Sequence, residues 1–478
     1  MKKNISIGVA FVVLIMVLVS CKALKDPVLP SFEEMPNEFT LQVSTGLNCG
    51  TLKPKDLFND PNLILLIDSA LKNNLELQQE LISIQQLEAD VLESRSMLLP
   101  KLGAFAGYSN RKFGLQTMDG AGNITTTIGD GEIIPILLND FNLGLQTSWE
   151  IDVWGKLKAR KNASLARLLA NKEYLNLLKT SIVEQVMSNY FALIILDEKK
   201  RYLNENLALN EQIVLVSEAQ KEAARGNSLS VQQFQALSLN YKNQLVLIEQ
   251  DIFFTENNLR QLTGSFGGEI KRSDLINNPL LEVALQSGLP AEVLNNRPDV
   301  KAAEKMIEAA KADLHAARAE FYPSLSINGS IGYQAYKTRF LFSSPESIAY
   351  GLFGNLMAPL VNRGEIKANF KRASSAQLEA YYTFQSVVLN AFTEINNGLF
   401  ALQTSNILLK NKKEEITLLE EARNTASELF QNNKISYYEF LNVQQNAMMS
   451  QMESLELLRE QFIWKIYLYK ALGGGCNN

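Results

Sequence analysis

The sequence predicts an α+β fold in which long antiparallel helical hairpins continue into strands of membrane-crossing length, arranged as two internal repeats. Three observations support this fold class. A run of seventy residues contains neither Gly nor Pro, a second run of similar length follows in the other half of the chain, and each half also contains two segments of alternating polarity. A chain of 478 residues could hold three ordinary domains, but two half-length repeats dominated by continuous helices favour one elongated architecture.

The first helical run covers residues 156–225, between Gly155 and Gly226. At about 1.5 Å per residue, an unbroken helix of this length would extend on the order of 105 Å. Its apolar residues recur in steps of three, four and seven, which is typical of a stripe buried along a bundle or coiled coil. A second helical run, 227–263, follows at once. We therefore predict an antiparallel hairpin with its tip at Gly226.

The second half of the chain repeats this hairpin. Residues 365–432 contain no Pro and one glycine, Gly398, and residues 435–472 form the returning helix. The turn is expected at Asn433, because Asn tolerates left-handed backbone conformations. The segments 155–158 and 364–367 also align, as GKLK and GEIK. One structural unit is therefore duplicated, with both hairpin tips at the same end.

Each repeat also contains a pair of predicted strands. Residues 141–153 alternate strictly between apolar and polar side chains, and residues 102–108 form a shorter, glycine-rich relative. The second half repeats the pattern at 324–333 and 348–356. Strands of roughly nine to twelve residues can cross an outer membrane when they are tilted. Four strands cannot close in lipid, so several copies are expected to share one barrel. The alternative is a soluble four-stranded sheet packed on the helices.

The N-terminus predicts export and lipidation. Lys2 and Lys3 precede an apolar stretch, 5–19, and the segment Leu18-Val19-Ser20-Cys21 is typical of a bacterial lipoprotein signal. Cys21 would then carry the lipid anchor. An ordinary signal peptide with an incidental cysteine remains the alternative. Cys49 and Cys476 could pair in an oxidising periplasm or remain free thiols.

These patterns divide the chain into five segments. We predict a signal peptide at 1–20, a proline-rich tether at 21–60, a first repeat at 61–264, an inter-repeat segment at 265–296 and a second repeat at 297–475. A first helix is expected from Pro61 to about Leu99, with a weak point at Asn73 and Asn74. In the second repeat, a helix beginning at Pro298 takes the same place.

Enzyme chemistry is not expected. His315 is the only histidine, and no phosphate-binding glycine loop stands between a strand and a helix. We therefore predict no catalytic residue, no cofactor and no metal site. The mixture of Lys and Glu gives no nucleic-acid footprint. No interior apolar run reaches the roughly eighteen residues of a spanning helix.

Four ordered motifs resemble the TolC-like outer-membrane factors, and the nearest branch is the lipidated OprM/NodT type. They are WEIDVWGK at 149–156, NRPDV at 296–300 continuing to Tyr322 and Pro323, PLVNRG at 359–364, and YKALGGG at 469–475. The resemblance covers about 61–475. It implies a homotrimer in which three copies, with four strands each, form one twelve-stranded barrel in the outer membrane, while the helices form an α-barrel across the periplasm.

The same resemblance implies a function. Members of this family are exit ducts of tripartite pumps, joined through a periplasmic adaptor protein to an inner-membrane transporter. The expected function is a passive duct for small molecules such as drugs or metals, in a protein anchored by lipid to the outer membrane. A type I protein-secretion duct is the first alternative, and a non-conducting structural lipoprotein is the second. The transported substrate and the class of transporter stay open.

Candidate site residues lie at two places. At the strand–helix junctions, Trp149 and Trp154 are candidates for a membrane interface or for simple packing, while Gly155 and Gly364 would let the chain turn without a clash. At the periplasmic tip, the resemblance places gate residues just after the second turn. The matching positions are Glu439 and Asn442. Asn442 departs from the family pattern, in which an acid is usual at the second position as well. Ser436-x-x-Glu439 is also a capping box, so Glu439 could close the aperture, cap the helix or do both.

Overall fold

The computed structural model describes residues 27–31, 36, 39, 47–48, 58, 60–128, 131–274, 285–286, 294–359, 364–432 and 434–474. They belong to two compact units. The first includes Gln85–Leu169 and Lys305–Tyr382, and the second includes Ala170–Glu304 and Thr383–Asn478, within the described ranges. None of the described helices combines the length and the hydropathy that a transmembrane helix needs.

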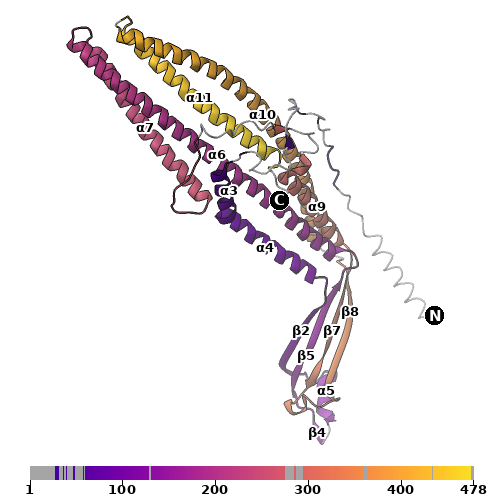
Figure 1. Ribbon diagram of the computed structural model, residues 1–478. Helices are drawn as coiled ribbons and strands as arrows, with labels where there is room; N and C mark the ends of the chain where they lie inside the picture. Colours follow the sequence, from indigo (N-terminus) through magenta and orange to yellow (C-terminus); the bar gives the residue numbers. More distant parts are fainter. Residues whose placement is uncertain are drawn as a thin grey trace. The chain divides into compact units, whose positions relative to one another are not determined.

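The first unit contains a four-stranded antiparallel sheet (Figure 1). Its strands are β2 (Lys101–Lys112), β5 (Leu137–Ile151), β7 (Ser324–Ala335) and β8 (Ile348–Met357), in the order β2-β5-β7-β8. Each repeat supplies one hairpin, and β5 pairs with β7 to join the two. Strand β2 extends beyond its predicted end and β5 begins before its predicted start, because backbone pairing continues through the polar pair Asn110 and Asn139, where the alternation of side chains is lost. Strand β5 ends at Ile151, two residues before its predicted end.

Helices precede and follow each strand hairpin in the same order. In the first repeat, α4 (Leu75–Ser96) leads into β2, and β5 leads into α6 (Lys156–Glu222). In the second repeat, α9 (Pro298–Ala319) leads into β7, and β8 is followed by α10 (Gly364–Gln431). This shared order confirms the internal repeat. Short elements occupy the connections within the hairpins: α5 (Met118–Thr125), β3 (Thr127–Ile128), β4 (Glu132–Ile133) and the 3-10 helix η4 (Thr338–Phe340).

The predicted weak point in the first helix is a real break. Helix α3 (Pro61–Asn73) begins with Pro at its first turn and ends at Asn74, which is buried. The Asn74 side chain caps the following turn, because its Oδ1 accepts a hydrogen bond from the Leu77 N–H at 3.1 Å. Its Nδ2 donates to the Leu262 carbonyl at 3.0 Å. Asn74 therefore ends one helix, starts the next and ties both to the end of α7 (Ser228–Leu262).

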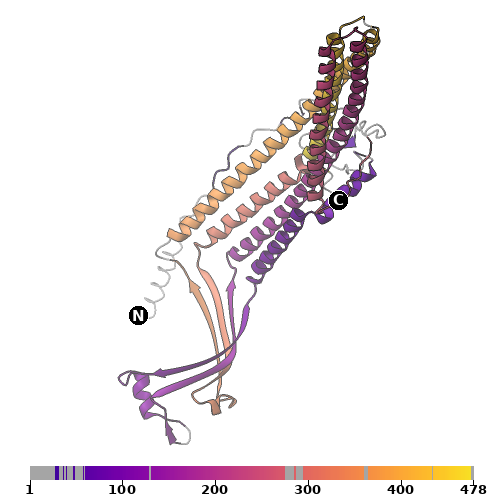
Figure 2. The same ribbon diagram turned by 90° about the vertical axis from the view of Figure 1, so that its left-hand side faces the viewer.

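The second unit contains the outer parts of two helical hairpins, α6 with α7 and α10 with α11 (Tyr437–Ala471) (Figures 1 and 2). A short parallel pair, β1 (Leu47–Asn48) with β6 (Leu285–Gln286), also belongs to it. The predicted apolar stripe of α6 faces inward, since every member is buried or half-buried: Leu168, Leu175, Leu178, Ile182, Val186, Leu193, Leu196, Leu203, Leu207 and Val214.

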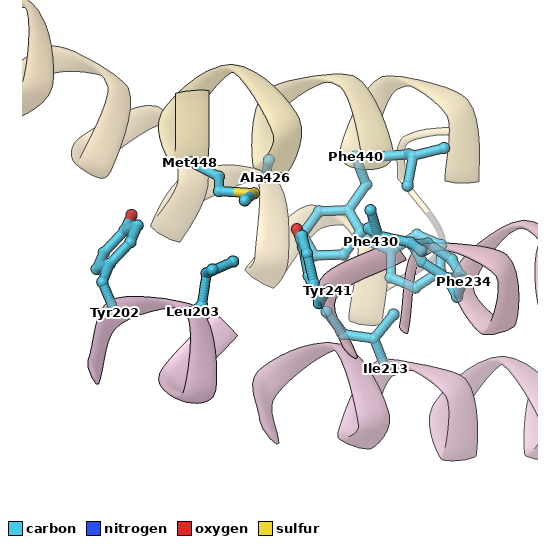
Figure 3. Packing of buried hydrophobic residues seen from close by; sticks show 11 residues of the cluster. Tyr202, Leu203, Ile213, Phe234, Tyr241, Ala426, Phe430, Phe440 and Met448 are labelled. Carbon is cyan, nitrogen blue, oxygen red and sulfur yellow. The ribbon is translucent and has the colours of Figure 1, made fainter. Parts of the chain in front are cut away.

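An aromatic cluster joins the two hairpins near their tips (Figure 3). Phe430 of α10 stacks on Phe440 of α11, with ring centroids 4.9 Å apart, and Phe234 of α7 lies 6.0 Å from Phe430. Tyr241 and Ile213 of the first hairpin belong to the same cluster. Because these side chains come from all four helices, the two tips lie side by side, as the repeat predicts.

The tip of the first hairpin differs from the prediction in its details. Helix α6 ends at Glu222, and Ala224, not the glycine, has the left-handed conformation, with φ 55°. The Gly226 N–H donates to the Gln220 carbonyl at 3.0 Å. A Cβ atom on Gly226 would lie 3.3 Å from the Cβ of Gln220. Glycine is therefore favoured here by the close return of the chain, and the long helix is shorter than the Gly- and Pro-free run.

Candidate functional site

The two faces of the sheet have opposite character. Residues that pair directly across antiparallel strands share a face, so the registers define each face completely. One face is apolar and carries Leu102, Tyr108, Phe141, Leu143, Leu145, Trp149, Leu325, Ile327, Ile331, Tyr333, Tyr350, Leu352 and Leu356. The other carries mainly small and polar side chains, including Ser109, Asn142, Gln146, Ser148, Ser326, Asn328, Ser330 and Gln334, with Phe105, Leu138, Phe353 and Met357 as exceptions.

The apolar face is not a protein core. Leu102 is 73% exposed, Leu352 is 75% exposed and Tyr350 is 83% exposed. A soluble sheet packed on the helices would bury these side chains. An exposed apolar face opposite a polar face is the arrangement of strands that separate lipid from a polar interior.

The junction tryptophans bond to backbone carbonyl groups of neighbouring segments. The Trp149 Nε1 donates to the Leu98 carbonyl at 3.1 Å, just before β2. The Trp154 Nε1 donates to the Pro323 carbonyl at 2.7 Å, just before β7, and its ring stacks on Tyr322 at 4.7 Å between centroids. Trp149 is thereby bonded to the segment that leads into β2, and Trp154 to the segment that leads into β7. A role at the membrane interface stays a prediction.

The first junction turns at a left-handed glycine. Gly155 has φ 73°, and α6 begins at the next residue. Asp152 caps this helix, because its carboxylate oxygens accept the backbone N–H groups of Leu157 at 2.9 Å and Lys158 at 2.8 Å. Gly364 is the first residue of α10. Its role in the turn from strand to helix stays a prediction.

The capping box at the second hairpin tip is present. The Glu439 N–H donates to Ser436 Oγ at 3.2 Å, and the Ser436 N–H donates to Glu439 Oε2 at 2.8 Å. The bond from the Ser436 backbone lowers the pKa of Glu439. Glu439 and Asn442 lie one turn apart on exposed positions of α11. Glu439 therefore caps the helix while its position on α11 remains exposed. A gating role for Glu439 and Asn442 stays a prediction. Asn433 and Cys21 lie outside the described residues, as do Cys49 and Cys476.

The NRPDV motif forms a buried ionic network that joins α9, α10 and α11. Arg297 donates to both carboxylate oxygens of Asp299, at 3.0 and 2.7 Å, and to Glu394 Oε2 at 2.8 Å. It also donates to the Ala471 carbonyl at 2.8 Å, at the end of the last helix. Burial opposes its charge, but bonds to Asp299 and Glu394 raise the pKa of Arg297. Arg297 and Asp299 therefore have a structural role, since they tie the start of α9 to α10 and to the end of α11.

A second buried network was not expected from the sequence. Asp60 is 1% exposed and accepts hydrogen bonds from the Tyr190 hydroxyl at 2.6 Å and the Ser273 hydroxyl at 3.1 Å. Burial, followed by the bond to Asp60, raises the pKa of Tyr190. These residues are far apart in sequence, and no local motif connects them. Within the described part of the chain, no group of three or more potential metal ligands is found.

The architecture has a clear match among known proteins. The sequence matches the family model described as "Outer membrane efflux protein" over residues 66–265 and 289–474. The chain belongs to this family. Its relatives include the pyoverdine export outer membrane protein OpmQ of Pseudomonas aeruginosa, 27% identical over 418 residues, or 87% of this chain and 86% of that protein. The cation efflux system protein CusC of Escherichia coli K12 is 25% identical over 449 residues, covering 92% and 93%.

Solved structures confirm the fold. A CusC structure superposes with a TM-score of 0.82 at 24% identity, covering 95% of this chain and 100% of that one. The CmeC outer membrane channel of Campylobacter jejuni gives a TM-score of 0.81 at 24% identity, covering 94% of each chain. The resemblance drawn from the four motifs is thus confirmed. This chain is an outer-membrane efflux channel, and its family consists of channel proteins.

Proposed function

We propose that three copies of this chain form a passive exit duct for small molecules in a tripartite pump. The observation that carries the proposal is the two-faced sheet with its open edges. In the order β2-β5-β7-β8, the described chain gives neither β2 nor β8 a partner on its outer side. Unpaired backbone groups are costly in hydrocarbon, so these edges require strands from other copies.

Pairing β2 of one copy with β8 of the next would remove all the edges. Both edge strands have their apolar side chains on the same face of the sheet, as shown by Leu102 and Leu352. A closed ring can therefore keep that face toward lipid and the polar face inward. Twelve strands enclose an interior wider than the eight-stranded barrels that side chains fill. This geometry supports an open duct lined by Ser, Asn and Gln.

The relatives support small molecules or ions as cargo. Their names describe pyoverdine export, solvent efflux and cation efflux. A duct lined by hydroxyl and amide groups has no single chemical preference, so specificity would come from the transporter that loads it. We therefore propose an inner-membrane transporter and a periplasmic adaptor as partners, with the adaptor meeting the paired hairpin tips.

Two further parts of the proposal concern anchoring and organisation. Cys21 would carry the lipid that holds the N-terminus at the outer membrane. The two duct-forming repeats would be 61–264 and 297–475, joined by 265–296, with 21–60 as the tether. Glu439 and Asn442 would lie at the narrow periplasmic opening.

Cysteine cross-linking tests the shared sheet. Each test variant carries two introduced cysteines. One replaces Ala106 on β2, and the other replaces Tyr350, Leu352 or Leu356 on β8. All four positions lie on the same face of the sheet. Oxidation should produce disulfides between copies and a ladder that ends at three chains. The matched control pairs the β8 positions with a cysteine at Leu143 on the interior strand β5, which should give no cross-link between copies.

Conductance completes the test. The purified channel in planar bilayers should conduct ions, and native mass spectrometry in detergent should show three copies. A monomer as the dominant species, or cross-links that form equally from Leu143, would contradict the shared sheet.

A further inference from the structure

Both strand hairpins have basic residues at the end of the sheet that lies away from its helices, an end that can be followed in Figure 2. Lys112 is the last residue of β2, Lys337 follows the end of β7 by two residues, and Arg339 lies in η4. The pair Lys112 and Leu137 belongs to the same face as Leu102 and Thr147, so Lys112 extends the apolar face. The apolar face therefore ends in a cation on β2.

Aromatic rings support these cations. Lys337 Nζ lies 5.7 Å from the centroid of the Tyr336 ring, and the Arg339 guanidinium carbon lies 4.5 Å from that of Phe340. Tyr336 and Phe340 are themselves 5.6 Å apart. Contacts of this kind hold a long basic side chain over a ring and reduce its hydration. The two cations are therefore partly positioned before any ligand arrives.

A belt of aromatic side chains lies just inside the cations. Tyr108 and Phe141, which pair across β2 and β5 on the apolar face, have ring centroids 4.9 Å apart. Tyr333 on the same face lies 5.7 Å from Phe342. Aromatic belts of this type mark the boundary between hydrocarbon and headgroups. The order along the face is thus hydrocarbon, aromatic belt and cations.

The two connections at this end of the sheet carry the cations Lys337 and Arg339 and also the exposed acids Asp119 and Glu346, and Lys112 at the end of β2 adds a further cation. Lys112 forms no ion pair among the described residues and is exposed. The nearby carboxylate of Asp140 belongs to the opposite, polar face and accepts a hydrogen bond from Gln334 Nε2 at 2.8 Å. Phosphate is the anionic group that Arg and Lys bind at this depth of a membrane.

We propose that Lys112, Lys337 and Arg339 bind the phosphate groups of phosphorylated lipid headgroups in the outer leaflet. The inference rests on the membrane placement given under the proposed function. It adds a lipid-binding site at the two strand hairpins. The bound headgroup would fix the depth of the sheet in the membrane, because the cations hold it directly above the aromatic belt.

A binding titration tests the site on the full-length channel in neutral detergent. The probe is bisphosphorylated lipid A in mixed micelles, compared with the same lipid after removal of its phosphates. The test variant is Lys112→Gln, Lys337→Gln and Arg339→Gln together. Each basic group near an anionic surface contributes a factor of about five. The triple variant should therefore lose on the order of 100-fold in affinity.

A matched control removes the same charge at the other end of the strands. Lys101→Gln, Lys158→Gln and Lys311→Gln together also delete three cations, from the start of β2 and from α6 and α9. This variant should keep its affinity. A charge-preserving variant, Lys112→Arg with Lys337→Arg and Arg339→Lys, should restore binding. If the triple variant does not fold, Lys112→Gln alone decides, with an expected loss of about five-fold.

Several results would overturn the proposal. They are equal affinity of the triple variant and the wild type, an equal loss in the control variant, or equal binding of the dephosphorylated lipid. Displacement of the lipid by inorganic phosphate at equal concentration would show a simple phosphate site instead. Conductance in neutral bilayers separates this test from the duct itself, since the triple variant should still conduct. Absence of conductance in the wild type would count against the duct and leave the lipid titration intact.

Discussion

Replacing Arg297 by Met should loosen the point where three helices meet. The substitution removes a guanidinium that binds Asp299, Glu394 and the Ala471 carbonyl, and it leaves two carboxylates without their cation. Breaking a buried ion pair on one side costs about 3–5 kcal/mol. The side chain of Glu394 is 41% exposed and that of Asp299 is 19% exposed, so water compensates part of this loss. We expect a value near 3 kcal/mol, at the lower end of this range.

Amide hydrogen exchange measures this loss locally. A cost near 3 kcal/mol corresponds to exchange on the order of 100-fold faster, at the start of α9 and the end of α11. Arg297→Lys keeps the charge, but one ammonium group cannot reach all three partners, so an intermediate increase is expected. Arg201→Met is the matched control, because Arg201 pairs with Glu198 and is 48% exposed. Its exchange should change by less than about five-fold.

The reasoning would be refuted by unchanged protection in Arg297→Met. Equal effects of the Arg201 and Arg297 substitutions would also refute it, because they would show that burial does not distinguish the two ion pairs.

Four further predictions concern the tips and the N-terminus. Glu439→Gln keeps a capping hydrogen bond and removes the charge, so an electrostatic gate formed with Asn442 predicts weaker cation preference in planar bilayers, whereas a pure cap predicts none. The folded state lowers the pKa of Glu439, so the ionised Glu439 stabilises the tip at pH values above its unfolded pKa. This stabilisation is lost as the pH falls through the folded pKa, and proteolysis at the tip should therefore increase only at acid pH. Ala224→Gly should slow exchange at the first tip by relieving a left-handed alanine, at about 1 kcal/mol, whereas Gly226→Ala should accelerate it. Cys21→Ser should abolish incorporation of labelled fatty acid, and equal labelling would exclude the anchor.

Local sequence patterns predicted most of the fold. The runs without Gly and Pro located α6, α7, α10 and α11, because long helices need no other signal than continuity and an apolar stripe. Strict alternation located the strands, and adjacent asparagines located the break at Asn74. The capping box was readable because Ser436 and Glu439 are three residues apart. These features all depend on neighbours in the sequence.

What the sequence did not predict depends on contacts between distant residues or on exact backbone angles. The partners of Arg297 on α10 and α11 come from the other end of the repeat. The bond between Asp60 and Tyr190 spans 130 positions and has no motif. The tip at Ala224 was missed because glycine usually takes the left-handed position, and here the glycine serves a close approach instead. The ends of β2 and β5 were missed because their polar pairs look like loop sequence.

The register between β5 and β7 has a consequence for the order in which the protein is built. Each strand hairpin joins nearby residues, so it can form as soon as its own repeat has been synthesised. The central pairing, such as Leu145 with Ile331, joins the two repeats and waits for nearly three quarters of the chain. Contacts between distant residues form slowly because long loops must close first. Until β7 is available, the edge of β5 is unpaired in addition to the outer edge of β2, so the chain should need a chaperone through this interval.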